Sequence, residues 1–250
     1  MTNPGAAAPS QTGGTPAASA RVPIWEDFID IFHSPSEVFA RRENGSFWIP
    51  MLILAALIGG LLLATSGVLS PIMDAEFQRG MAATLRRNPQ LTADQMATGR
   101  HIGEIIAKVG AFIFVPIGIF FTGLFLWIIG KAFDAKESLH TALVVAAYAT
   151  VPRVLEVVLS AVQAMFMDPA SLTSHFSVSL SAARFLNPDT ASPLTLSLLG
   201  HLDVFTIWLT ALLAIGLSVT GKIPRSRAAF AAAFLWVLGI VPGLIQAARS

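Results

Sequence analysis

Long apolar stretches separated by shorter polar connections dominate the chain. Five of them come close to, or exceed, the roughly 20 residues that a helix needs to cross a hydrocarbon core about 30 Å thick. In lipid only helices and closed barrels satisfy their own backbone polar groups, so this pattern predicts an all-α, polytopic membrane bundle with five transmembrane helices. The expected spans lie at about residues 47–70, 109–130, 139–167, 203–221 and 228–247.

The third apolar stretch carries polar residues near its middle. Pro152, Arg153 and Glu156 interrupt it, and each half alone is too short to span, so it is either one kinked span, which we favour, or two half-helices. A charge at the centre of a span costs about 2.5 to 3.5 kcal/mol, but Arg153 and Glu156 are spaced i, i+3 on one helix face and can neutralise each other. The pair, with Tyr148 one turn earlier, either orders the bundle or marks a solute or proton path.

An amphipathic pattern precedes the first span. Apolar residues at i, i+3, i+4 and i+7 alternate with acidic ones, which predicts a helix lying along the cytoplasmic membrane surface within residues 23–46. Ser34-Pro35-Ser36-Glu37 is typical of a helix start with a capping box, so a second short helix should follow. The apolar residues either anchor the bundle or form a docking surface for a membrane or cytoplasmic protein partner; the candidates are Trp25, Phe28, Ile29, Phe32 and Phe39.

The connections complete the expected organisation. Residues 1–20 contain no charged side chain and little apolar bulk, so we expect a disordered polar tail over residues 1–22. The first long connection, residues 71–108, should contain two helical pieces broken at Asn88-Pro89. Thr92 and Gln95 then offer a capping box from which a helix can run into the second span. Residues 47–248 form the expected transmembrane domain.

Composition and charge support a membrane protein and suggest its orientation. The chain is 54% hydrophobic and 12% charged, about half the charged fraction of a soluble domain. A net charge of +1 offers no basic face for a nucleic acid, so we expect no nucleic-acid partner. Basic residues in the short connections predict a cytoplasmic N-terminus and an outer C-terminus in the cell (inner) membrane, although the first long connection is also basic. The short connections carry Arg41, Arg42, Lys131, Lys136, Lys222, Arg225 and Arg227.

Catalytic and metal-binding patterns are missing from the sequence. There is no cysteine, the five histidines have no zinc-ligand spacing, and no nucleophile elbow or phosphate loop occurs. His201-x-Asp203 is better explained as a helix start, because Asp is favoured near a helix N-terminus. We therefore expect no enzyme activity, metal or cofactor.

Small residues recur at helix-packing spacing in two spans. Gly59 and Gly60 lie in the first, and Gly239 and Gly243 in the last. Such residues let helices approach closely in lipid. Most should pack within the chain, and a homo-oligomer contact through the last span is an open alternative.

Together these features resemble bacterial members of the Yip-one domain family. The resemblance rests on Ser34-Pro35-x3-Phe39, on Tyr148-Ala149-x2-Pro152-x2-Leu155, and on Asp203-x-Phe205-x2-Trp208. It implies a five-span membrane protein with a cytoplasmic N-terminus. Eukaryotic relatives bind Rab-type GTPases and assist vesicle trafficking, so the resemblance favours a non-enzymatic membrane adaptor or organiser. The alternative is a small transporter or permease component that uses the Arg153 and Glu156 face.

Overall fold

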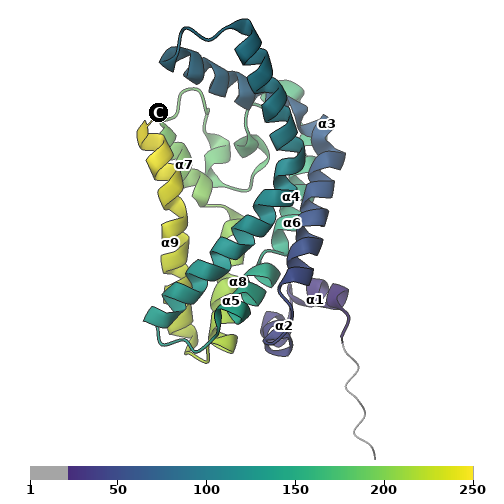
Figure 1. Cartoon of the computed structure of the whole chain (residues 1–250), viewed down its shortest axis with the longest axis vertical. Helices are drawn as coiled ribbons and strands as arrows, with labels where there is room; N and C mark the ends of the chain where they lie inside the picture. Colours follow the sequence, from purple (N-terminus) through teal and green to yellow (C-terminus); the bar gives the residue numbers. More distant parts are fainter. Residues whose placement is uncertain (1–21, 250) are drawn as a thin grey trace, which may run out of the picture.

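The protein is a bundle of α-helices (Figure 1). The computed structural model describes residues 22–249, and no strand occurs in that range. Three 3₁₀ turns, η1 to η3, lie between α6 and α7: Pro169–Ser171, His175–Val178 and Ala182–Phe185. The helices are α1 (Ile24–Asp30), α2 (Pro35–Arg42), α3 (Trp48–Arg87), α4 (Ala93–Ala132), α5 (Leu139–Ala149), α6 (Pro152–Phe166), α7 (Pro193–His201), α8 (Val204–Thr220) and α9 (Arg225–Arg249). The predicted tail falls almost entirely outside the described residues.

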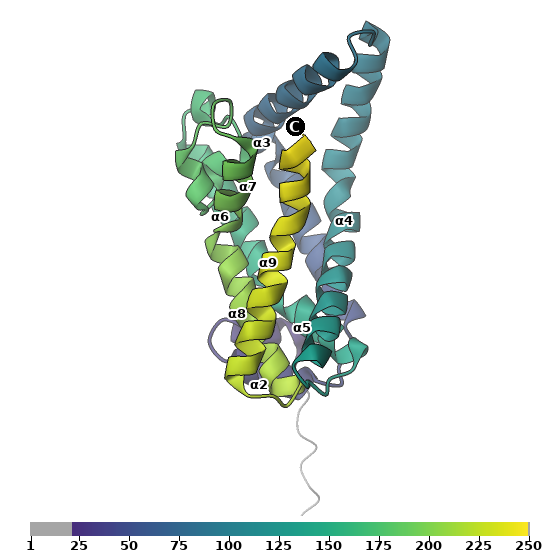
Figure 2. The same cartoon turned by 90° about the vertical axis from the view of Figure 1, so that its left-hand side faces the viewer.

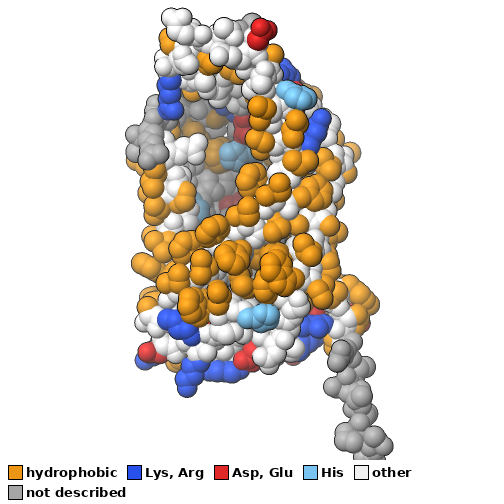
Figure 3. Space-filling view, in the orientation of Figure 1, with side chains coloured by type: hydrophobic (Ala, Val, Ile, Leu, Met, Phe, Trp, Pro, Cys, Tyr) orange, Lys and Arg blue, Asp and Glu red, His pale blue; other side chains and the backbone are white. Residues whose placement is uncertain are grey.

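The predicted all-α membrane bundle is confirmed. Helices α3, α4 and α9, and α5 together with α6, are long and apolar enough to cross a membrane, and α8 is a shorter apolar helix. At 17 residues, α8 lies at the lower limit of about 17 residues for a spanning helix. Hydrophobic side chains form a broad belt, and basic and acidic side chains gather below it (Figure 3).

Helices α3 and α4 form a long antiparallel pair. Both continue well beyond the apolar stretches, so most of the first predicted connection belongs to these two helices. The predicted break and cap are present: α3 ends at Arg87, and Thr92 and Gln95 bond each other's backbone N–H at 3.3 and 3.0 Å. The C-terminal part of α3, beyond Pro71, leans across the end of the bundle towards the start of α4 (Figure 2).

The third apolar stretch is a kinked run of two helices. Thr150 and Val151, which separate α5 from α6, keep right-handed helical backbone angles. The Arg153 N–H bonds the Thr150 carbonyl at 2.9 Å, which makes a tight turn, and Pro152 stands at the first position of α6 where its missing N–H is harmless. The backbone of the third apolar stretch is therefore kinked at Thr150 and Val151, as in the arrangement that we favour from the sequence.

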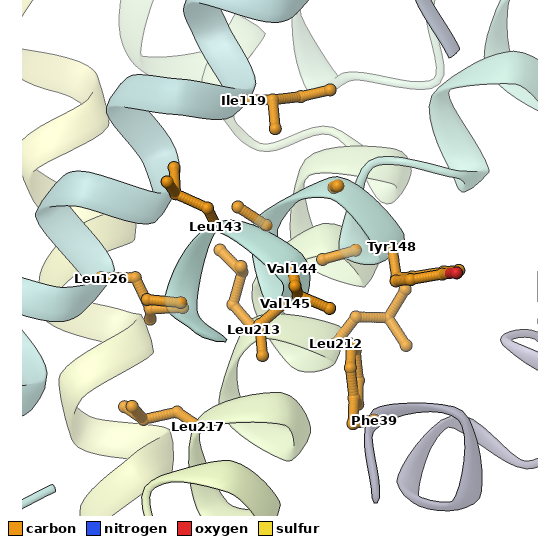
Figure 4. Close-up of a cluster of buried hydrophobic side chains, with 14 of the residues drawn as sticks. Phe39, Ile119, Leu126, Leu143, Val144, Val145, Tyr148, Leu212, Leu213 and Leu217 are labelled. Carbon is orange, nitrogen blue, oxygen red and sulfur yellow. The ribbon is translucent and has the colours of Figure 1, made fainter. Parts of the chain in front are cut away.

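Helix α5 lies at the centre of the bundle. Every residue from Thr141 to Ala149 is buried, and α5 packs against α4 and α8 (Figure 4). Two glycines permit this close packing. A Cβ on Gly123 of α4 would lie 2.9 Å from the Leu143 Cα, and one on Gly216 of α8 would lie 2.3 Å from the Val145 Cγ1. The core therefore depends on the close approach of the α4 and α8 backbones to α5, as well as on the packing of apolar side chains.

The four glycines expected to pack helices behave differently. A Cβ on Gly59 would lie 2.7 Å from the Phe112 ring, whereas one on Gly60 would meet no described atom within 4 Å. Gly239 and Gly243 face α7, where added Cβ atoms would lie 3.2 Å from the His201 ring and 2.3 Å from the Ser197 Oγ. The small residues of the last span therefore already serve a contact within the chain.

Candidate functional site

A buried carboxylate holds the two N-terminal helices together. Asp27 of α1 is fully buried and receives the Arg41 Nε on one oxygen and the Arg42 Nε on the other, each at 2.6 Å. Arg41 also donates to Asp30, and Arg42 donates to the Val22 carbonyl. Charge-assisted bonds of this kind are among the strongest in proteins, so α1 is fixed on α2. We call Asp27, Arg41, Arg42 and Tyr148 the Asp27 cluster.

Tyr148 connects the Asp27 cluster to the centre of the bundle. Its hydroxyl donates to Asp27 Oδ2 at 3.3 Å, and the residue is almost completely buried at the end of α5. Phe28 packs edge-on against the Tyr148 ring, with 6.0 Å between ring centroids. Helix α1 is therefore attached to the transmembrane core and not only to its neighbour in sequence.

The attachment orients α1 in an unexpected way. The periodicity places Asp27 on the polar side of an amphipathic helix, yet Asp27 is fully buried in the protein. Trp25 and Ile29 are 59% and 56% exposed, and Phe32, at 38%, contacts the Trp208 ring edge-on at 5.2 Å. Trp25 and Ile29 consequently point outward, whereas Ile24 and Phe28 of the same helix pack against the core.

The docking candidates divide into two groups. Trp25, Ile29 and Phe32 are exposed, whereas Phe28 is partly buried against Tyr148. Phe39 of α2 is fully buried in the core, close to Gly216, so including it in a docking surface is wrong.

The start of α2 is only partly as expected. Ser34 precedes α2 as predicted, but its side chain makes no capping hydrogen bond, so the predicted capping box is wrong.

Arg153 and Glu156 form the expected ion pair. The Arg153 Nη1 lies 2.6 Å from Glu156 Oε2, and its Nη2 donates to the Thr206 hydroxyl of α8 at 3.0 Å. This pair is separate from the Asp27 cluster, because Tyr148 points to Asp27 and not to Arg153. The four intramembrane polar candidates, Tyr148, Pro152, Arg153 and Glu156, therefore do not make one site.

Arg153 and Glu156 line a large cavity between α3, α4 and α6. Its volume is about 1060 Å³, and η2 and Leu209 of α8 complete the lining. The molecule is visibly hollowed between α4 and α9, with acidic and histidine side chains inside the hollow (Figure 3). The sequence indicates the polar pair but not the cavity, because the lining residues come from helices that are far apart in the sequence.

The comparisons with known proteins agree with this architecture. A family model described as the Yip1 domain matches residues 29–245, which run from α1 to α9. The chain belongs to the Yip1 domain family. It is 27% identical to the membrane protein YknW of Bacillus subtilis over 223 residues, which are 86% of this chain and 89% of the relative. No solved structure matches.

The described part of this Yip1-domain chain has no geometry suited to a metal ion. No group of three His, Asp or Glu residues is close enough there to hold a metal ion. Asp203 caps α8, where its Oδ1 accepts the N–H groups of Phe205 and Thr206 at 2.8 and 3.2 Å. His201 instead makes a 2.9 Å bond with the Trp236 carbonyl of α9. The helix-start interpretation of this pair is confirmed.

The α4–α5 connection contains a buried acid that was not among the candidates expected from the sequence. Glu137 is 4% exposed, and its carboxylate oxygens have no hydrogen-bond partner among the described residues. Burial raises the pKa of Glu137, and the nearby Lys131 opposes this shift. Gly130 and Gly221 provide the space, since Cβ atoms there would lie 2.5 and 2.7 Å from the carboxylate oxygens. No local sequence pattern indicates that Glu137 is buried, because Gly221, which makes part of the space around its carboxylate, is far from Glu137 in the sequence.

Proposed function

We propose that this Yip1-domain protein is a non-enzymatic membrane adaptor in the cell (inner) membrane, with a cytoplasmic N-terminus and an outer C-terminus. Its docking surface, called the α1 face below, is formed by the exposed Trp25 and Ile29 of α1 and by Phe32, which follows this helix. The observation that carries the proposal is the Asp27 cluster, which fixes α1 so that this face points outward.

The Asp27 cluster attaches α1 to the core more rigidly than a membrane anchor requires. An amphipathic helix binds a bilayer through its apolar face without a rigid attachment to a core. Here the carboxylate is fully buried and two arginines bond to it, which preorganises the helix. Preorganised aromatic residues are typical of protein-binding hot spots, because little entropy is lost on binding. The surface fits a protein partner with an apolar groove at the membrane surface.

Affinity purification tests the proposal. The tagged full-length chain is purified from its native membranes in mild detergent, and co-purifying proteins are quantified by mass spectrometry. The variant Trp25→Ser/Ile29→Ser/Phe32→Ser removes the face but leaves the Asp27 cluster. Phe230→Ser is the matched control, because Phe230 is a 70% exposed aromatic on α9. Deleting residues 21–42 would be a poor test, since Phe39 and Val38 belong to the core.

The expected result is one near-stoichiometric partner with the parent and with Phe230→Ser, and its loss from the triple variant. The same partner retained by the triple variant, or no partner with the parent, would contradict the adaptor role.

The cavity containing Arg153 and Glu156 supports a second candidate, a small transporter or permease component. This predicts proton- or solute-dependent flux in reconstituted vesicles that Glu156→Gln abolishes. Equal flux from the parent, the variant and empty vesicles would rule it out.

A further inference from the structure

The cavity between α3, α4 and α6 is elongated. Its lining positions on α4 run from Arg100 to Thr122, a rise of about 33 Å along a straight helix axis. Its volume of about 1060 Å³ is slightly above the roughly 300 to 1,000 Å³ typical of ligand pockets. A compact polar solute would fill only a small part of this space, whereas a molecule with a hydrocarbon chain fits its length.

The two ends of the cavity differ in chemistry. The part towards the centre of the bundle is lined mainly by apolar side chains, including Ile58, Leu62, Val115, Ile119 and Leu209. Arg153 and Glu156 also lie in this part, but they neutralise each other and Thr206 takes a further Arg153 donor. A hydrocarbon chain would therefore meet no unbalanced charge there.

The outer end carries charges of both signs. Arg100 bonds Asp74 at 3.2 Å and Glu104 at 3.1 Å, and His175 bonds Glu76 at 2.6 Å. Over the whole cavity, four carboxylates stand against three Lys or Arg side chains: Asp74, Glu76, Glu104 and Glu156 against Arg100, Lys108 and Arg153. Lys108 has no hydrogen bond or ion pair with any residue in the described range, 22–249. Without the Arg153–Glu156 pair, three carboxylates remain against two Lys or Arg side chains, so the outer end offers the unpaired cation of Lys108 beside one more carboxylate than cation.

We propose that this cavity binds one molecule of a zwitterionic phospholipid. Lys108 contacts the phosphate, the carboxylates of Asp74 and Glu104 contact the ammonium group, and an acyl chain lies along α4 between α3 and α6. The ammonium group would join Arg100 as a second cation beside Asp74 and Glu104, at an end of the cavity where carboxylates outnumber Lys and Arg side chains, so the site favours the zwitterion over an anionic headgroup. This site lies on other elements than the α1 face and does not depend on the adaptor role.

Site-directed fluorescence quenching tests the proposal in the full chain, which has no native cysteine. Ser160→Cys places a small fluorophore on α6 inside the cavity, and Phe234→Cys places the same fluorophore on the exposed outer face of α9. Both proteins are reconstituted in nanodiscs that contain an equal mole fraction of phosphatidylethanolamine or phosphatidylglycerol, each spin-labelled near the middle of an acyl chain.

The expected result is quenching at position 160 that is about threefold stronger with the zwitterionic lipid, a factor in the range of one exposed ion pair, and equal quenching at position 234. Adding Lys108→Gln with Asp74→Asn should abolish the preference but leave the melting temperature unchanged, because these side chains are exposed.

Three results would overturn the proposal. No quenching at position 160 would show that no acyl chain enters the cavity. Equal quenching by both lipids would show that the charges do not select the headgroup. A preference that survives Lys108→Gln with Asp74→Asn would place the headgroup elsewhere.

Discussion

The Tyr148 hydroxyl and the Asp27 carboxylate meet 3.3 Å apart although 121 positions separate them in the sequence. Tyr148 ends the buried helix α5, and Asp27 belongs to a short helix before the first apolar stretch. The contact joins the N-terminal helices to the centre of the bundle, so the orientation of the α1 face is a property of the whole fold. A seven-residue helix would not be stable alone in water or hold a fixed direction.

Replacing the buried carboxylate should release α1. Asp27→Asn removes the charge that Arg41 and Arg42 share, and we expect a loss of stability of about 2 kcal/mol, because both arginines are partly exposed and can be rehydrated. The measurement is thermal unfolding in detergent, together with limited proteolysis of the N-terminal helices. Asp30→Asn is the control, since it removes only the outer partner of Arg41 and should lower the melting temperature less. Equal melting temperatures for Asp27→Asn and the parent would show that the cluster does not hold the helices.

Two glycines of α4 should respond in opposite ways to the same substitution. Gly123→Ala places a methyl group against the α5 backbone and should destabilise the protein by about 1 to 3 kcal/mol. Gly118→Ala meets no described atom within 4 Å and should be neutral or raise stability by up to about 1 kcal/mol through helix propensity. Unfolding of both variants, side by side, checks the prediction. A Gly123→Ala variant as stable as Gly118→Ala would contradict the close α4–α5 approach.

The buried Glu137 should make stability depend on pH. Its pKa in the folded state is raised above the ordinary value of 4.5, so the folded state binds the proton more tightly than the unfolded state. This contribution is complete below pH 4.5 and is lost as the pH rises through the folded-state pKa. Glu137→Gln should therefore melt at a higher temperature than the parent at pH 7.5 and differ little from it at about pH 4.5.

Lys131→Gln provides a useful second variant for this prediction. The Lys131 side chain opposes the raised pKa of Glu137, so its removal should raise that pKa further and steepen the pH dependence. Parallel pH profiles for the parent and Glu137→Gln would show that Glu137 is not buried as an acid.

Single cysteines should report the topology directly. Ser10→Cys and Ser250→Cys place one thiol at each end of a chain with no other thiol. Five crossings predict that a membrane-impermeant reagent added outside intact cells labels position 250 and leaves position 10 unlabelled. Labelling of both from one side would require an even number of crossings, and α8, as the shortest apolar helix, would be the element to reconsider.

The sequence predicts what depends on local pattern and misses what depends on distant contacts. Apolar runs and caps locate α3, α4 and α9, and the i, i+3 spacing correctly pairs Arg153 with Glu156. The same logic does not predict the burial of Asp27, because its partners lie on α2 and α5. Glu137 is missed for a similar reason, since its space is made partly by Gly221 in another connection.

The burial of α5 separates the centre of the protein from the lipid. Helices α3 and α4 are each 40 residues long and largely exposed along their apolar windows, while α5 has 11 residues and is almost fully enclosed. Hydrophobic mismatch acts on helices that touch acyl chains, which respond by tilting or bending. In a thicker or thinner bilayer the outer pair would adjust its tilt, and the enclosed α5 would keep its packing.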